Sequence, residues 1–376
     1  MQDFFIHLPA STERGKGCKA WGIQSEFVLP FPLSNDAWEK AQSWLDQEEG
    51  NWIFSLLSYE AGFQHLGVEL KNNPIQPALL FIVPKNIEWF AENEINTENH
   101  KLPSLLFSPV ENEESYYNKL NTIKAHLMRG DYYETNYCTQ LMTEVSEMNP
   151  YQRWLQLFQA NPAPHAAFVQ WKAHHLMCLS PERFIQKKGD TLISQPIKGT
   201  IKKGTTQEED QILKNQLNHS LKDNTENTMI VDLVRNDLSK IAQKGSVKVT
   251  ELAHIYSFPK LHHLVSTVQC QIKPGINFTS IMAAMFPMGS MTGVPKKNAV
   301  NSMHDLETNP RGWYSGTLGI ILPNGDFDFN VIIRSIYWNN NSHQANIGIG
   351  GAITLHSNFK EEYQECWLKA QSLINP

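Results

Sequence analysis

The sequence has few of the features that mark secreted, membrane-spanning or nucleic-acid-binding proteins. Its five cysteines are scattered and none forms a Cys-x-x-Cys pair, which argues against a disulfide framework and a zinc knuckle. No apolar run is long enough to cross a bilayer, and the N-terminal residues lack the basic and then apolar pattern of a signal peptide. With 32 basic against 38 acidic residues and no basic stripe, neither nucleic acid nor a membrane is expected as a partner. We therefore expect a cytoplasmic protein.

The order of apolar and polar residues predicts an α+β protein. The chain has 376 residues, and the 41% that are hydrophobic suffice for a large core. Helical spacing predicts helices over 113–129 (with Tyr117, Leu120, Ile123 and Leu127 on one face), 150–160, 208–241 (with a break near 223–225) and 359–374. Short strands joined by turns, among them a hairpin at Asn324-Gly325, alternate with these helices. We therefore expect a layered α/β sandwich, in which two mostly antiparallel sheets pack face to face with helices outside.

One polar segment divides the chain without separating two independent domains. Residues 92–100, Glu-Asn-Glu-Ile-Asn-Thr-Glu-Asn-His, are the best linker candidate, but they are too few to argue for domains that fold alone. Residues 1–100 are therefore expected to form a reduced α/β region that belongs to the same sandwich as residues 101–376.

The segment 182–200 places one acid and one amine close together in the sequence. A hairpin signal at residues 187–190 lies between two apolar runs, and pairing of these runs would bring Glu182 and Lys198 toward one end of the hairpin. Lys198 stands between an isoleucine and Gly199, and burial of an ammonium in such surroundings would lower its pKa. A neutral amine is a nucleophile, and a nearby carboxylic acid can protonate a departing hydroxyl. The alternative is an ordinary surface lysine on a loop.

Two pairs of acids have the spacing of a helix face. Asp223 and Glu226 are three residues apart, as are Glu362 and Glu365, so each pair would lie on one side of a helix. If the two helices face each other, the four carboxylates could bind Mg²⁺, which takes one or two carboxylates directly and others through water. Helix capping by Asp223 and favourable interaction of Glu362 with the helix dipole explain the same residues without a metal.

Three further stretches could contact an anionic ligand. Residues 287–296 form a turn-rich loop before a helix, where free backbone N–H groups can hold an anion, although such a loop is often only a connection. Arg334 interrupts an otherwise apolar strand, and a buried arginine needs an anionic partner. Residues 347–352 are rich in glycine, which permits close approach of the backbone to a ligand and fits a plain turn equally well.

Together these stretches resemble the chorismate-utilising enzymes, a family that includes anthranilate synthase component I, aminodeoxychorismate synthase component I, and the isochorismate and salicylate synthases. The resemblance is dense over roughly residues 110 to 375 and looser over the first hundred residues, around residues 57–62. The segments that carry it are 182–200, 223–237, 287–296, 311–316, 332–335, 347–352 and 362–369. It implies an anthranilate synthase component I-like fold, with residues 101–376 as the chorismate-binding catalytic region.

The resemblance also implies roles for the candidate residues. Glu182 would be the general acid and Lys198 the nucleophile, and His263 takes the position of the family's histidine. The ligands of Mg²⁺ would be Asp223, Glu226, Glu362 and Glu365. Chorismate would be contacted by Gly199, Thr200, Ser290, Tyr314, Arg334, Gly350, Gly351 and Lys369.

Position 198 discriminates between branches of this family. Anthranilate synthases usually have alanine there, whereas aminodeoxychorismate synthases have a lysine that attacks C2 of chorismate and displaces the C4 hydroxyl. Ammonia then attacks C4 and expels the lysine, which gives 4-amino-4-deoxychorismate, a precursor of 4-aminobenzoate and folate. Isochorismate and salicylate synthases need a lysine base where this chain has Glu134, so the resemblance favours aminodeoxychorismate synthase component I.

The source of ammonia and two other functions stay open. The chain has no cysteine of the kind that glutamine amidotransferases use, so ammonia would come from solution or, as in the family, from a separate amidotransferase subunit. Glu134 stands where relatives often have glutamine, and Met288 where glycine is usual, and either could reshape ammonia entry or ring packing. The alternatives are anthranilate synthase component I and a non-catalytic subunit that only docks a glutaminase.

Overall fold

The computed structural model describes residues 3–11, 15–91 and 104–374, and the linker candidate 92–100 lies outside them. Within the described residues, the helices are α1 (Ala37–Gln47), α2 (Phe63–Leu66), α3 (Glu113–Arg129), α4 (Pro150–Ala160), α5 (Gln207–Asn218), α6 (Leu221–Ile241), α7 (Phe278–Met285), α8 (Lys296–Leu306) and α9 (Phe359–Ile374). Strands of the first part are β1 (Phe4–Leu8), β2 (Gly17–Leu29), β3 (Ile53–Leu57), β4 (Leu79–Phe90), β5 (Ser108–Pro109), β6 (Glu134–Glu144), β7 (His165–Trp171), β8 (His174–Ser180) and β9 (Arg183–Lys188). The later strands are β10 (Thr191–Gln195), β11 (Ile197–Lys202), β12 (Lys248–Ser257), β13 (Leu261–Gln271), β14 (Gly293–Val294), β15 (Thr317–Ile321), β16 (Phe327–Val331), β17 (Ser335–Asn339) and β18 (Gln344–Ile353).

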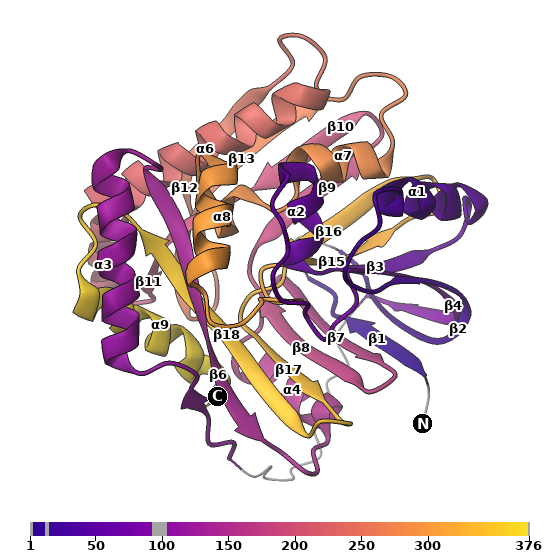
Figure 1. The fold of residues 1–376 in the computed structure, drawn as a ribbon, viewed down its shortest axis with the longest axis horizontal. Helices are drawn as coiled ribbons and strands as arrows, with labels where there is room; N and C mark the ends of the chain where they lie inside the picture. Colours follow the sequence, from indigo (N-terminus) through magenta and orange to yellow (C-terminus); the bar gives the residue numbers. More distant parts are fainter. Residues whose placement is uncertain (1–2, 12–14, 92–103, 375–376) are drawn as a thin grey trace.

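Antiparallel pairing joins these strands into one large curled sheet (Figure 1). One half runs β6-β18-β17-β8-β7-β1, with β5 and β14 also paired to β6. The other half runs β2-β4-β3-β15-β16-β9-β10-β13, and both β11 and β12 pair with β13. Because β1 pairs with β2, the two halves are continuous, and the expected division into two separate sheets is not confirmed.

Three hydrophobic clusters show how this sheet is covered. The first packs α1, α6 and α7 on the half that contains β9 and β13, and the second packs α3, α4, α8 and α9 on the half that contains β6 and β18. The third cluster contains no helix residue and joins apolar side chains from strands of both halves, such as Phe54 of β3 and Val169 of β7. Successive side chains of a strand point to opposite faces of the sheet, so alternate residues of one strand belong to different clusters. The helices lie outside and the two halves of the sheet face each other.

Two local expectations from the sequence are wrong. The helical tract breaks at His219-Ser220 and not near 223–225, because Ser220 is the N-cap of α6 and its hydroxyl accepts a hydrogen bond from the backbone N–H of Asp223. In α3 the buried tyrosine is Tyr116, whereas Tyr117 is 46% exposed. The apolar stripe Tyr116, Leu120, Ile123, Leu127 follows the i, i+4, i+7, i+11 spacing of a helix face. None of the helices in the described parts of the chain is long and apolar enough to cross a membrane.

Candidate active site

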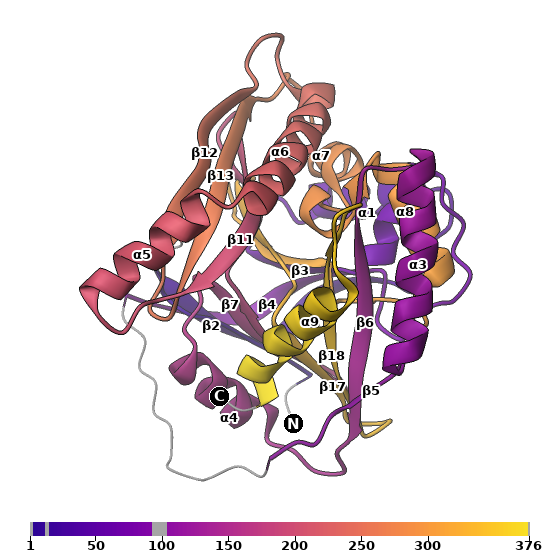
Figure 2. The ribbon, with the colours of Figure 1, turned by 90° about the vertical axis from the view of Figure 1, so that its left-hand side faces the viewer.

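One cavity brings together most of the residues that the sequence predicts for the site. It has a volume of about 990 Å³ and lies where β11 and α6 face β18 and α9 (Figure 2). Its walls contain Glu182, Lys198, Gly199, Thr200, Asp223, Glu226, His263, Ser290, Tyr314, Arg334, Gly350, Gly351, Glu365 and Lys369. Glu362, the remaining predicted residue, is buried beside the cavity. It forms an ion pair with Lys222, whose Nζ lies 3.0 Å from Glu362 Oε1.

Gly199 lets β11 approach α6 closely. Its φ of +80° is a conformation that other residues rarely adopt, and a Cβ atom there would lie 3.0 Å from the side chain of Asp223. The strand and the first turns of the helix therefore meet without an intervening side chain. This contact places Lys198 and the acids of α6 in the same cavity.

Lys198 is buried, but burial does not leave its amine neutral. Its side chain is only 9% exposed, and Nζ donates a hydrogen bond to Glu134 Oε1 at 2.7 Å. Burial pushes the pKa of Lys198 down, but the carboxylates of Glu134 and Glu226 outweigh it and hold that pKa above its ordinary value. The expected lowering of the lysine pKa is therefore wrong for the protein without substrate, because a desolvated ammonium paired with a carboxylate keeps its proton.

Glu182 has the environment of a carboxylic acid that can donate a proton near neutral pH. It lies between β8 and β9 and is 4% exposed. Burial raises its pKa to about 7, although Ser290 and Lys198 act in the opposite direction. A substantial fraction of Glu182 is therefore protonated at neutral pH, as a general acid requires.

His263 is held as a neutral imidazole. It is buried on β13, and burial together with Arg334 lowers its pKa to about 3. Its Nδ1 lies 2.8 Å from the hydroxyl of Thr200 on the neighbouring strand. His263 therefore carries no charge and holds the hydroxyl of Thr200 at the edge of the cavity that both residues line.

Glu226 has a buried carboxylate oxygen without a hydrogen-bond partner among the described residues. The residue is buried, burial raises its pKa to about 7, and this oxygen is Oε1. Asp223 on the same face of α6 and Glu365 on α9 line the same cavity. Since Ser220 caps the helix, capping does not explain the presence of Asp223 at this position.

The acids on the other helix are paired with lysines. Besides the contact of Lys222 with Glu362, Lys369 Nζ lies 2.7 Å from Glu365 Oε1. Across the described ranges, no group of three or more histidine, cysteine, aspartate or glutamate side chains is close enough together to hold a metal ion. The donors fit a partly hydrated Mg²⁺ held by one or two of these carboxylates rather than a dry cluster of four.

Arg334 and Tyr314 form a positively charged and hydrogen-bonding end of the cavity. Arg334 is partly buried in the connection between β16 and β17, with a φ of 51° that is unusual for a residue other than glycine. Tyr314 packs over Gly348 so closely that a Cβ atom at Gly348 would lie 2.1 Å from its ring. A guanidinium and a phenol hydroxyl at this end of the cavity can hold a carboxylate by charge-assisted hydrogen bonds.

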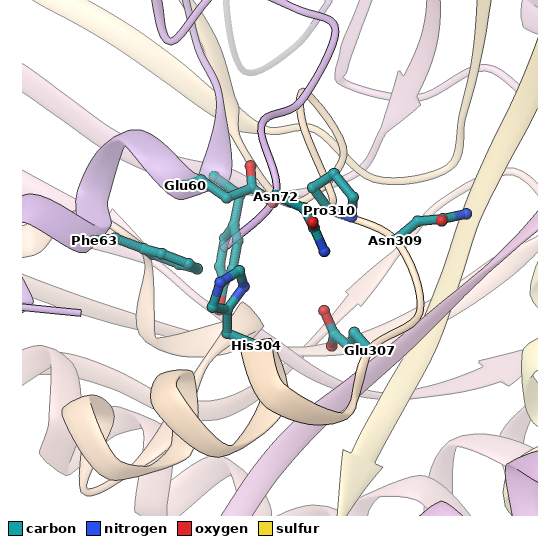
Figure 3. Close-up of a pocket in the computed structure, with 8 residues that line it drawn as sticks. Glu60, Phe63, Asn72, His304, Glu307, Asn309 and Pro310 are labelled. Atoms are coloured by element: carbon teal, nitrogen blue, oxygen red, sulfur yellow. The ribbon is translucent and has the colours of Figure 1, made fainter. Parts of the chain in front are cut away.

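Arg311 belongs to a neighbouring network and not to the cavity. Its guanidinium lies 2.6 Å from Glu307 and donates to the carbonyl oxygens of Met291 and Asn136, so it fastens the Ser290 loop. Figure 3 shows the small hollow beside this network, lined by Tyr59, Glu60, Phe63, Asn72, His304, Glu307, Asn309 and Pro310. Its volume of about 10 Å³ has room for one water molecule and not for a substrate.

Three residues that line the cavity were not singled out from the sequence. Asn136 lines the cavity and donates to the carbonyl oxygen of Ser290 at 2.6 Å, and Lys222 lies on the cavity wall in contact with Glu362. Position 348 needs a glycine, because the ring of Tyr314 occupies the space that a Cβ atom would take. The spacing of Lys222 four residues before Glu226 was a usable signal, whereas the contacts of Asn136 and Gly348 depend on which strands become neighbours.

Comparison with known proteins decides the family. The sequence profile of the chorismate binding enzymes matches residues 19–375. The chain belongs to this family. The predicted resemblance is therefore confirmed, and the cavity described above is the candidate chorismate site.

Curated relatives include aminodeoxychorismate synthases and an anthranilate synthase component 1. The chain is 39% identical over 272 residues to the chloroplastic aminodeoxychorismate synthase of Arabidopsis thaliana, covering 72% of this chain and 29% of that protein. It is 34% identical over 284 residues to aminodeoxychorismate synthase component 1 of Bacillus subtilis, covering 75% of this chain and 60% of that protein. An anthranilate synthase component 1 of Haloarcula marismortui is 30% identical over 283 residues, covering 73% of this chain and 57% of that protein. The chain therefore spans less than two thirds of these relatives.

Solved structures of the family share the fold. The anthranilate synthase component I of Streptococcus pneumoniae superposes with a TM-score of 0.82 at 22% identity, covering 97% of this chain and 93% of that chain. A putative 2,3-dihydroxybenzoate-specific isochorismate synthase of Bacillus anthracis superposes with a TM-score of 0.77 at 19% identity, covering 99% of this chain and 95% of that chain. These similarities establish a mixed α/β fold built on a large antiparallel sheet, and at this level of identity they establish nothing about the reaction.

Proposed function

We propose that this chain is an aminodeoxychorismate synthase component I, which converts chorismate and ammonia to 4-amino-4-deoxychorismate. The observation that carries the proposal is the position of Lys198, which points into the cavity together with Glu182, the carboxylic acid whose pKa is about 7. An amine that can bond to C2 and an acid that can protonate the C4 hydroxyl are the two groups that this substitution needs. The names of the relatives from Arabidopsis and Bacillus agree with it.

The remaining residues of the cavity would bind and orient chorismate. Arg334 and Tyr314 offer a cation and a hydroxyl to one carboxylate of the substrate, and the Ser290 loop offers further donors. The acidic residues of α6 and α9 would hold Mg²⁺, which would neutralise the other carboxylate when bound. Ammonia would come from an amidotransferase subunit or from ammonium in solution. The alternative product is anthranilate, because an anthranilate synthase component 1 is also a relative.

Identification of the product tests the proposal. The protein is incubated with chorismate, Mg²⁺ and ammonium, and the product is identified by mass spectrometry and by its conversion to 4-aminobenzoate with an added lyase. We expect 4-amino-4-deoxychorismate. Anthranilate as the main product would support the alternative enzyme, and no Mg²⁺-dependent consumption of chorismate with any nitrogen source would support a non-catalytic docking subunit.

The acid pairs make a separate prediction about Mg²⁺. The substitution Glu226→Gln removes the buried charge whose oxygen has no partner, so it is expected to weaken Mg²⁺ binding about 10-fold or more while the fold is kept. A titration of activity with Mg²⁺, and of Mg²⁺ binding by calorimetry in the presence of chorismate, measures the shift. The matched control is Glu251→Gln, which changes a glutamate on β12 that is bound to Thr267 and Tyr256. An unchanged Mg²⁺ requirement in Glu226→Gln would remove this residue from the metal site.

A further inference from the structure

The ion pair of Lys198 with Glu134 is not explained by the roles given so far. Glu134 is the first residue of β6, and its side chain has no exposed surface. Its Oε1 lies 2.7 Å from Lys198 Nζ, and its Oε2 has no hydrogen-bond partner in the parts of the chain that the structure describes. Burial of a carboxylate costs free energy unless both of its oxygens have hydrogen-bond or ion-pair partners. Among the described residues, Glu134 has such a partner at only one oxygen.

The proposed attack of Lys198 on chorismate creates a need for a base. An ammonium has no electron pair to share, so Nζ must lose a proton before it can bond to carbon. Three other carboxylates act on this amine from surrounding elements, Glu182 before β9, Glu226 on α6 and Glu365 on α9, but the ion pair of Lys198 is with Glu134. Glu182 needs to keep its own proton for the leaving hydroxyl, and Glu226 and Glu365 belong to the candidate metal site.

We propose that Glu134 is a catalytic base, which takes the proton of Lys198 before the attack and returns it when the lysine is expelled. The inference rests on the proposed function, because it concerns the same covalent step. Binding of chorismate covers the cavity, and exclusion of water favours a neutral amine and a neutral acid over the separated charges. The geometry already places donor and acceptor at hydrogen-bond distance, as a proton transfer requires.

The two glutamates then account for all protons of the reaction. In the first half, Nζ gives a proton to Glu134 and bonds to C2, the C4–O bond breaks, and the proton of Glu182 leaves with the oxygen as water. In the second half, ammonia bonds to C4 and the Nζ–C2 bond breaks. The new C4 ammonium gives a proton to Glu182, and Glu134 returns its proton to Nζ, so both acids and the lysine end in their starting states.

The substitution Glu134→Gln tests this role, because glutamine can accept the hydrogen bond of Lys198 but cannot take its proton. We measure kcat at saturating chorismate, Mg²⁺ and ammonium from pH 6 to pH 8, and divide the value of the variant by that of the wild type. Glu182 and Glu365 act on the rate in both proteins, whereas the charge of Glu134 helps to raise the pKa of Glu226, so the ratio is measured with each protein saturated with Mg²⁺. We expect a ratio of about 10⁻² at pH 6 that rises about tenfold per pH unit, since the variant must lose the proton to solvent, with little change in the KM for chorismate.

A merely structural role of Glu134 would lower the rate without changing its dependence on pH. A constant ratio, or a ratio near one at every pH, would therefore overturn the inference. The matched control is Glu111→Gln, which changes another buried glutamate that pairs with a lysine, Lys119, at 2.8 Å, and its ratio is expected to stay near one. If the wild type makes no 4-amino-4-deoxychorismate, both the proposed function and this inference are wrong. If the wild type makes this product but the ratio of the two kcat values does not change with pH, only the inference is wrong.

A second variant covers the case in which Glu134→Gln does not fold. The substitution Glu134→Asp keeps a carboxylate but withdraws it by one methylene group, so proton transfer stays internal over a longer distance. We expect a lower kcat with a constant ratio to the wild type from pH 6 to pH 8. A ratio for Glu134→Asp that rises with pH, or a rate equal to that of the wild type, would count against the catalytic role.

Discussion

Replacing Lys198 by alanine is expected to lower the rate of 4-amino-4-deoxychorismate formation at least about 10³-fold, because the amine that bonds to C2 is lost. Binding of chorismate is expected to change far less, since Arg334 and Tyr314 remain in the cavity wall. Steady-state assays with ammonium measure the rate, and quenching of protein fluorescence by chorismate measures binding. A variant that keeps the wild-type rate and product would contradict a covalent role of Lys198.

The control for this variant has to separate chemistry from stability. Loss of Lys198 leaves Glu134 buried without its cation, and breaking a buried pair in this way costs about 3–5 kcal/mol. The double variant Lys198→Ala/Glu134→Gln removes this penalty and is expected to unfold at a higher temperature than the single variant, yet to stay inactive. Formation of anthranilate by either variant would mean that Lys198 selects the product and is not needed for turnover.

Replacing Glu182 by glutamine is expected to lower kcat about 10²- to 10⁴-fold at pH 6, where the acid is mostly protonated in the wild type. Burial raises the pKa of Glu182 to about 7, and its acid form is the active one. The wild-type kcat at saturating Mg²⁺ should therefore be greatest below pH 7 and fall as the pH rises above it, while the residual activity of Glu182→Gln lacks this decline. A wild-type profile that stays level to pH 9, or a glutamine variant of equal activity, would exclude Glu182 as the general acid.

The sequence predicted those features of the fold that depend on local spacing. The bounds of α3, α4 and α9 follow from their apolar repeats, and caps such as Asn112 and Asn149 reinforce them. The continuity of the sheet could not be predicted, because it depends on the pairing of β1 with β7 and of β3 with β15, which are far apart in sequence. Periodicity says which face of a strand is buried and not which strand lies beside it.

The candidate site was predicted as a set of residues, but its electrostatics was not. Lys198 reads in sequence as an amine among apolar neighbours, which suggests a lowered pKa, whereas the fold places the charge of Glu134 in contact with it and holds that pKa above its ordinary value. The same limit applies to Glu362, whose partner Lys222 comes from a different helix. Charges that meet only through tertiary packing set these pKa values, so the sequence alone gave the wrong sign for Lys198.

Mass analysis of the protein after reaction with chorismate and Mg²⁺ in the absence of ammonia tests the central claim most directly. Without ammonia the second half of the reaction cannot proceed, so an adduct of dehydrated chorismate is expected to accumulate, and peptide mapping should place it on the side chain of Lys198. Subsequent addition of ammonium should release the adduct as 4-amino-4-deoxychorismate. An unmodified Lys198 in a preparation that still converts chorismate when ammonium is present would contradict the account.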